Sequence, residues 1–320
     1  MFKEMRTPEL GHPIHDYALG KLISASNLSG GYTNKNVYIN TTAGEYVLRI
    51  SHAARTKEEV VFEADVLKKL KQTPAGDFVV DIIETPDGSP FVIRNGHINT
   101  LFRFVKGEDF YNTWDRHNPD THFIESLGKK CAILHRSLSN IDAPKATRES
   151  LPTRLRKYYL DLESLGLDMK PYHSLINLTE GSSLVHTDLR IRNFVVNTSE
   201  ISTIIDFDDI TYGNQLYDIA WIIKECFSLQ QIGSQPTPVI NIEATKLFLK
   251  WYQSNFEGKV NTEDIVRIMA IACLGTLHFL FFSASNSMTR ERIEQLTSIN
   301  LAQLDLFSKG DAIASAIVPV

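Results

Sequence analysis

Three oxygen-bearing side chains, Asp188, Asn193 and Asp206, are spaced so that they could meet at one site. Asn193 follows Asp188 by five residues, and Asp206 follows the second of two short apolar runs, Phe194–Val196 and Ile201–Ile205. An Asn-Thr-Ser turn between the runs predicts a tight β-hairpin. Such a hairpin would return Asp206 to the neighbourhood of the other two side chains.

This trio suits phosphoryl transfer from a magnesium nucleotide. Mg²⁺ prefers hard oxygen ligands and keeps several waters, so Asn193 and Asp206 would suffice as protein ligands. Asp188 would stay unliganded and accept the proton of an attacking hydroxyl. Little covalent work is left for the protein, because catalysis of this reaction depends mainly on positioning and charge stabilisation. We therefore predict Mg²⁺ and a nucleoside triphosphate at this site.

The segment His186–Asn193 (HTDLRIRN), followed by Ile205–Asp208 (IDFD), resembles the aminoglycoside phosphotransferase and choline kinase family. That family has the protein-kinase-like fold and includes kinases of homoserine, methylthioribose and hydroxylysine. The resemblance covers roughly residues 20–285. It implies an ATP- or GTP-dependent kinase that phosphorylates a hydroxyl of a small molecule, with Asp188 as the catalytic base and Ile205 beside the nucleotide.

Some positions depart from the family pattern, which often has Gly after the His and a His or Lys two residues after the catalytic Asp. Here these positions are Thr187 and Arg190. Arg190, a catalytic candidate, would either contact the transferring phosphate as a fixed cation or be a solvated surface residue. Asp208 stands where protein kinases have the Gly of Asp-Phe-Gly, and it would hold a second Mg²⁺ or merely line the site. Arg192 is expected at the surface or facing the substrate.

A glycine turn lies between two predicted strands, Leu22–Leu28 and Asn36–Asn40. The adjacent Gly30 and Gly31 allow backbone N–H groups to point at an anion, although most such pairs form ordinary hairpin turns. The family has a similar loop over the nucleotide phosphates. The resemblance therefore implies nucleotide contacts for the residues of this turn: Ser29, Gly30, Gly31, Thr33 and Asn34.

A buried ion pair is predicted between the third strand, Glu45–Ile50, and the helix Thr56–Lys71, which begins with a capping box. Glu63 lies within the apolar stripe of this helix, where a carboxylate is costly unless it is paired. Arg49 is the natural partner, with a local Lys as the structural alternative. In the kinase fold this pair positions the α/β-phosphates, and the resemblance also places Val47 at the nucleotide.

Turn patterns predict a hairpin of Val79–Thr85 with Pro90–Arg94, and a further turn at Asn95-Gly96 leads into Ile98–Val105. These strands would complete a five-stranded antiparallel N-lobe. Phe104 and Val105 resemble the hinge between lobes, where adenine would bond to the backbone.

The remainder is predicted to be mainly helical. Helices are expected at 123–140, 217–229, 242–255, 262–285 and 290–308, with an irregular helical segment at 151–178. His135 lies on an apolar face and is expected to be a hydrogen-bonded core residue. Asp218 either favours a helix dipole or, as in the family, braces the catalytic loop. The fold class is therefore α+β and protein-kinase-like, with a nucleotide-binding N-lobe at 1–105 and a helical C-lobe at 106–320 that carries the catalytic loop and substrate pocket.

Composition limits the setting in which this site works. The 320 residues can form two lobes. The net charge is −5, with acidic and basic residues interspersed, and there is no basic tract that would indicate binding to nucleic acid. Cys131, Cys226 and Cys273 are expected to be free thiols in a reducing cytoplasm. The N-terminus lacks a signal-peptide pattern, and the apolar stretch Ile268–Ser285 is expected to be a buried helix. We expect a cytoplasmic monomer or homodimer without a membrane partner.

Two other functions compete with that of a small-molecule kinase. A pseudokinase or nucleotide-binding regulator is disfavoured because every charged position that the chemistry requires is present. A protein kinase is disfavoured because only Asp209–Gln215 separates Asp208 from the next helix, which leaves no platform for a peptide. The acceptor stays open: homoserine, another amino alcohol, a sugar and an antibiotic such as an aminoglycoside are all compatible.

Overall fold

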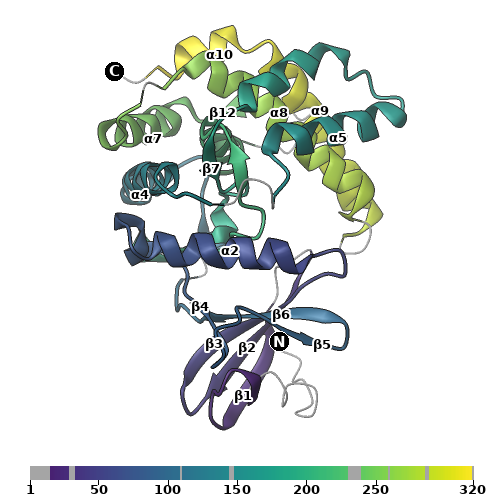
Figure 1. Cartoon of the computed structure of the whole chain (residues 1–320). Coiled ribbons are helices and arrows are strands. Elements are labelled where there is room, and N and C mark those ends of the chain that lie inside the picture. Colours follow the sequence, from purple (N-terminus) through teal and green to yellow (C-terminus); the bar gives the residue numbers. More distant parts are fainter. Residues whose placement is uncertain are drawn as a thin grey trace. The chain divides into compact units, whose positions relative to one another are not determined.

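The computed structural model describes residues 15–28, 33–108, 110–143, 148–229, 239–258, 260–284 and 288–318. The chain divides into two compact units, Met1–Lys106 and Gly107–Val320. Strands dominate the first unit and helices the second (Figure 1).

The N-terminal unit is built on a six-stranded sheet in the order β1-β2-β3-β6-β4, with β5 also paired to β6. All of these pairs are antiparallel. The strands are β1 (Leu22–Leu28), β2 (Lys35–Thr41), β3 (Gly44–Ile50), β4 (Ile82–Ile83), β5 (Val92–Arg94) and β6 (His97–Arg103). The expected count of five strands is therefore wrong.

The predicted hairpin of Val79–Thr85 with Pro90–Arg94 is also wrong. Its turn exists, closed by a hydrogen bond from the Thr85 amide to the Ser89 carbonyl (2.9 Å), but both arms pair with β6. Strand β6 is long enough for β4 and β5 to share one of its edges, at opposite ends. The turn at Asn95-Gly96 is confirmed, because both residues have positive φ (51° and 77°) and connect β5 to β6.

The two faces of this sheet have different roles. One face is apolar and buries a cluster that includes Val37, Ile39, Leu48 and Leu101. On the other face Arg49 meets α2 (Lys57–Leu70), through Glu63. Helix α2 begins as predicted, because Thr56 and Glu59 form a complete capping box.

The C-terminal unit consists mainly of helices. They are α3 (Phe110–Thr113), α4 (Thr121–Ser139), α5 (Leu151–Ser164), η4 (Lys170–Thr179), α6 (Leu216–Ile222), the π-helical turn η6 (Ile223–Phe227), α7 (Ile242–Asn255), α8 (Thr262–Phe282), α9 (Arg290–Ser308) and α10 (Asp311–Ala316). Helix α8 packs against α5, α6 and α9, and α4 packs against α7. The helix predicted at 217–229 ends early, because its second half is π-helical and is followed by the short strand β11 (Ser228–Leu229), which pairs with β12 (Val239–Ile240).

Helix α8 contains most of the long apolar stretch noted in the sequence. Among the described residues it alone is long and apolar enough to cross a membrane, by length and composition, and 61% of its most apolar window is buried. Its contacts with α5, α6 and α9 are those of a core helix.

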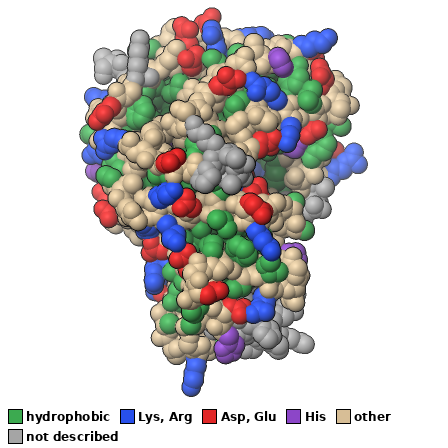
Figure 2. Space-filling model, in the orientation of Figure 1, with side chains coloured by type: hydrophobic (Ala, Val, Ile, Leu, Met, Phe, Trp, Pro, Cys, Tyr) green, Lys and Arg blue, Asp and Glu red, His purple; other side chains and the backbone are tan. Residues whose placement is uncertain are grey.

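Figure 2 shows one face of the molecular surface, on which Lys and Arg side chains are intermingled with Asp and Glu.

Candidate active site

The loop that carries Asp188 lies between two short antiparallel strand pairs. Strand β7 (Ser183–Val185), which pairs with β10 (Thr211–Gly213), leads into the loop. The loop ends in the single turn η5 (Ile191–Asn193), and the hairpin β8 (Phe194–Asn197) and β9 (Glu200–Ile204) follows. The predicted hairpin is confirmed, and its second strand returns the chain so that the Ile205 amide donates to the Asn193 carbonyl (3.0 Å).

The Asp188 carboxylate is held through one of its two oxygens. Its Oδ2 accepts hydrogen bonds from Arg190 Nε (3.0 Å), Arg190 Nη2 (2.6 Å) and Asn193 Nδ2 (2.8 Å). Within the described chain no donor reaches Oδ1. Three donors therefore fix the orientation of the carboxylate, and one oxygen is left to accept from a further group.

The environment of Asp188 raises its pKa to about 7. Burial is the main cause, and the Asp209 carboxylate adds to it, whereas Arg190 and Asn193 act in the opposite direction. A carboxyl group with a pKa near neutrality suits a general base, because it can both accept and release a proton.

Asp218 braces this loop from behind, as predicted. Its fully buried carboxylate accepts from the backbone amides of His186 (2.8 Å) and Thr187 (2.7 Å) and lies 3.2 Å from His135 Nε2. His135 also contacts the Tyr252 hydroxyl (2.8 Å), so it is the hydrogen-bonded core histidine that we expected. These contacts hold Thr187 at a φ of 69°, a left-handed conformation that is unfavourable for a β-branched residue.

His186 links the loop to the strand end that follows β9. Its Nε2 lies 3.1 Å from the Ile205 carbonyl, and its Nδ1 is 3.3 Å from the Asp188 amide. Burial lowers the pKa of His186, so the neutral ring donates through Nε2 and accepts through Nδ1. This arrangement makes the histidine a structural bridge within the loop.

The two other acids of the motif lie just after the hairpin. Asp206 has a φ of 67°, which is rare for a residue other than glycine and is typical of functional turns. Its charge, with that of Asp188, helps to raise the pKa of Arg190 above the ordinary value, against the effect of burial. Asp206 therefore lies in the same electrostatic environment as the loop that carries Asp188.

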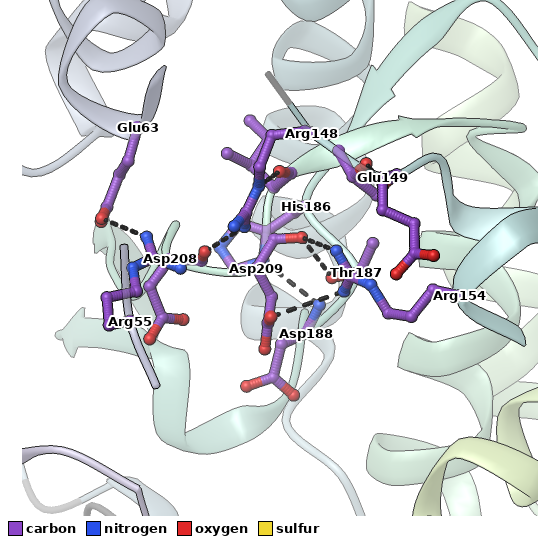
Figure 3. A network of polar contacts seen from close by, with 12 residues as sticks. Arg55, Glu63, Arg148, Glu149, Arg154, His186, Thr187, Asp188, Asp208 and Asp209 are labelled. Atoms are coloured by element: carbon purple, nitrogen blue, oxygen red, sulfur yellow. Dashed lines mark hydrogen bonds and ion pairs between the residues drawn. The ribbon is translucent and has the colours of Figure 1, made fainter. Parts of the chain in front are cut away.

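Arg148 holds the backbone around Asp208. It donates to the Asp208 carbonyl and, through Nε, to the Ile210 carbonyl (3.0 Å). Thr187 Oγ1 donates to the Asp209 carbonyl (3.1 Å), and Figure 3 shows this set of contacts around Asp188. The segment after Asp206 is thus hydrogen-bonded both to the loop that carries Asp188 and to Arg148.

Asn193 has one side-chain oxygen that could serve as a magnesium ligand. The Asn193 amide nitrogen is occupied by Asp188, which leaves its Oδ1 as the potential ligand atom. In the part of the chain that the structure describes, no three His, Cys, Asp or Glu side chains form a metal cluster. Magnesium does not require such a cluster, because phosphate oxygens and waters complete its shell.

The predicted ion pair of the N-terminal unit is confirmed and has a third member. Arg49 Nη2 donates to Glu63 Oε2. Arg55 Nη2 donates to the same oxygen (3.0 Å), as Figure 3 shows. All three side chains are buried, with at most 5% of any side chain exposed. The Arg49 guanidinium also lies 4.7 Å from the centre of the Phe102 ring. One carboxylate therefore positions two guanidinium groups.

The other predicted nucleotide-binding residues are placed as follows. Ser29, Gly30 and Gly31 lie outside the described residues. Thr33 and Asn34 precede β2, with Asn34 Oδ1 accepting from the His52 amide (3.3 Å), and Val47 is on the Arg49 face of β3. Phe104 and Val105 follow β6, and the Phe104 amide donates to the Glu45 carbonyl (3.1 Å).

Three contacts were not predicted. Arg55 lies two residues before α2 and about two helical turns before Glu63. This spacing could have predicted the contact between the two side chains. Arg190 pairs with Asp188, which neither interpretation of Arg190 anticipated. Arg148 reaches Asp208 across 60 residues of sequence, and no local pattern indicates such a contact.

Comparisons with known proteins find similarity over most of the chain. The model of the phosphotransferase enzyme family matches residues 24–235. A homoserine kinase of Bradyrhizobium diazoefficiens is 22% identical over 271 residues, which cover 79% of this chain and 76% of the relative. A homoserine kinase of Neisseria meningitidis serogroup B is 24% identical over 225 residues, covering 66% of this chain and 69% of the relative.

Solved structures confirm the predicted fold class. A microcompartment-associated aminopropanol kinase matches with a TM-score of 0.67 at 18% identity, over 98% of this chain and 99% of its own. The amicoumacin kinase hAmiN, in complex with AMP-PNP, Ca²⁺ and Ami, matches with a TM-score of 0.68 at 16% identity, over 98% and 96% of the two chains. The chain therefore has the kinase-like fold.

Proposed function

The chain belongs to the phosphotransferase enzyme family, and from this membership we propose that it transfers the terminal phosphate of ATP or GTP to a hydroxyl group of a small molecule. It is a small-molecule phosphotransferase. The N-terminal unit would bind the nucleotide, and the C-terminal unit would supply the catalytic loop and bind the acceptor.

The open oxygen of Asp188 carries this proposal. Its Oδ2 is fixed by three donors, while no described residue donates to Oδ1. An acceptor hydroxyl bound at Oδ1 would be oriented toward the phosphate and would pass its proton to the carboxylate as the new O–P bond forms. Arg190 would then be a positioning residue for Asp188.

Asn193 Oδ1 and the Asp206 carboxylate would hold Mg²⁺, with Asp208 as a candidate for a second ion. When bound, the ion neutralises charge on the nucleotide phosphates. In the N-terminal unit, Arg49 would contact the phosphates while Glu63 positions its guanidinium.

The acceptor is proposed to be an amino alcohol such as homoserine. The names of the relatives support this class, because two are homoserine kinases and one structural neighbour is an aminopropanol kinase. Sugars and antibiotics are the competing acceptors. We place the reaction in the cytoplasm, since Cys131, Cys226 and Cys273 are buried free thiols.

The test is an ADP- and GDP-release screen with both nucleotides across amino alcohols, sugars and aminoglycosides. We expect an amino alcohol to stimulate nucleotide turnover in the presence of Mg²⁺ and to yield a phosphate monoester detected by phosphorus NMR. Turnover that no acceptor stimulates would contradict the proposal.

A further inference from the structure

Glu63 receives a second arginine, Arg55, from the short connection between β3 and α2, residues 51–56. Arg55 Nη2 donates to Glu63 Oε2 at 3.0 Å, as Figure 3 shows. Arg49 Nη2, from β3, donates to the same oxygen. The side chains are 5% exposed for each arginine and 1% exposed for Glu63. Two buried cations therefore share one oxygen of a buried carboxylate.

The way in which Glu63 binds the two arginines leaves donors of Arg49 for another group. A guanidinium and a carboxylate form their most specific pair through two parallel N–H···O bonds to both oxygens. Glu63 forms no such pair, because its buried Oε1 accepts from no donor among the described residues. Since a guanidinium carries five N–H donors, Arg49 keeps donors that Glu63 does not use.

The position of Arg55 is fixed without any contribution from Arg49. The Arg55 amide donates to the His52 carbonyl (3.1 Å), and the next residue, Thr56, caps α2 within a complete capping box. The His52 amide in turn donates to Asn34 Oδ1 (3.3 Å). Arg55 therefore reaches Glu63 from a defined turn at the start of α2, whereas Arg49 reaches it from the sheet.

This arrangement matters because a buried carboxylate must stay paired. Removing one partner of a buried ion pair is strongly destabilising, since it leaves an uncompensated charge. If Arg49 were the sole cation on Glu63, directing its donors at a phosphate would weaken that pair whenever a nucleotide bound. With Arg55 present, Glu63 keeps a cation, and the two side chains remain a neutral pair.

We propose that Arg55 is a positioning residue for nucleotide binding: it compensates Glu63, so that Arg49 can turn donors toward the nucleotide phosphates while the buried carboxylate stays paired. This inference rests on the proposed function, in which Arg49 contacts the phosphates. Arg55 acts through Glu63 and does not touch the nucleotide. The contribution of the phosphates to nucleotide affinity therefore depends on the charge of Arg55.

The test separates the phosphate contribution to affinity from that of the base and the sugar. Calorimetry on the full chain with Mg²⁺ gives the Kd of ATP and of adenosine, and likewise of GTP and guanosine. The quotient of nucleoside Kd over triphosphate Kd, the phosphate ratio, reports what the phosphates contribute. Arg55→Ala should fold, because Arg49 stays bonded to Glu63. It should lower the phosphate ratio about tenfold and leave the Kd of the nucleoside unchanged.

Two further variants show whether charge is the cause. Arg55→Lys keeps the cation and should restore a large part of the phosphate ratio. The control Lys68→Ala removes another cation at α2, whose side chain is 54% exposed, and should change neither Kd. A merely structural role of Arg55 would lower the melting temperature of Arg55→Ala and leave the phosphate ratio unchanged.

A cycle with Glu63→Gln tells action through Glu63 from direct contact with phosphate. In the Glu63→Gln background no carboxylate needs compensation, so adding Arg55→Ala should leave the phosphate ratio unchanged. A further tenfold loss there would show that Arg55 contacts the phosphates itself and would overturn the positioning role. If Arg55→Ala does not fold, Arg55→Gln, which lacks the charge, takes its place. If Glu63→Gln does not fold, the comparison of Arg55→Ala with Arg55→Lys decides the question.

The outcomes distinguish this role from the proposed function. A phosphate ratio that survives Arg55→Ala, or that falls equally in Arg55→Ala and Arg55→Lys, would overturn the role of Arg55 alone. If the unsubstituted chain bound neither triphosphate more tightly than its nucleoside, the proposed function would be contradicted, and the role of Arg55 with it.

Discussion

Replacing Asp218 by Asn tests how the catalytic loop is held. The carboxylate accepts two backbone hydrogen bonds, at 2.8 Å from His186 and 2.7 Å from Thr187, in a fully buried position. Asn offers one oxygen and one N–H₂ group, so one backbone donor must face another donor. The charge that strengthens the remaining bond is lost as well.

The expected cost follows from these contacts. Hydrogen bonds to a charged group contribute about 1.5–3 kcal/mol each, and an unsatisfied buried donor costs about 1–3 kcal/mol. Since Asn keeps one bond in neutral form, Asp218→Asn should destabilise the C-terminal unit by about 2–4 kcal/mol. For a unit of this size that corresponds to a fall in Tm of roughly 5–15 °C. A small displacement of Asp188 should also lower kcat by about a hundredfold.

The assay is thermal unfolding combined with steady-state kinetics on the best acceptor. Asp311→Asn is the matched control, because that side chain is 90% exposed and its exchange should change stability by less than about 0.5 kcal/mol. If Asp218→Asn kept the wild-type Tm and kcat, the bracing role would be refuted.

Further predictions concern the charges of the two units. Glu63→Ala should destabilise the protein by about 3–5 kcal/mol, because it leaves two buried guanidinium groups without their carboxylate; Arg49→Ala should cost less, since Arg55 keeps its bond to Glu63. Combined, these two substitutions should be non-additive in both unfolding free energy and nucleotide KM, and additive effects would argue against the pair. Asp206→Ala should remove the Mg²⁺-dependent part of nucleotide binding in a titration, and unchanged binding with Mg²⁺ would exclude Asp206 as a ligand. Arg190→Ala should lower kcat by about a hundredfold at unchanged nucleotide KM, because two of the three donors to Asp188 Oδ2 are lost; a raised nucleotide KM would instead indicate phosphate contact.

Local patterns in the sequence predicted the parts of the fold that depend on local chemistry. The capping box placed the start of α2 at Thr56, and the turn residues Asn95-Gly96 fixed the hairpin of β5 and β6. Strand partners that are distant in the sequence were harder to predict. The pairing of β4 with β6 depends on which edge of β6 is free, and that edge is defined only once the sheet has formed.

The same distinction applies to the candidate site, where residues close together in the sequence were easier to predict than contacts between distant segments. Asp188, Asn193 and Asp206 could be named as candidates because their spacing within one short stretch is itself the signal. The pairing of Arg49 with Glu63 followed from the cost of a buried carboxylate. Arg148 was not predicted, because its contacts with the Asp208 and Ile210 carbonyls join segments that are distant in the sequence and meet only in the folded chain. The π-helical turn at Ile223–Phe227 was hidden as well, since its residues are compatible with an ordinary α-helix.

Asp188→Asn tests the central assignment most directly. The substitution keeps the shape of the side chain but removes the basic oxygen, so the variant should fold, bind Mg²⁺-nucleotide with wild-type affinity and lose acceptor-dependent turnover by several orders of magnitude. Turnover within about tenfold of wild type, measured as phosphorylated product, would show that the carboxylate of Asp188 is not the base of this reaction.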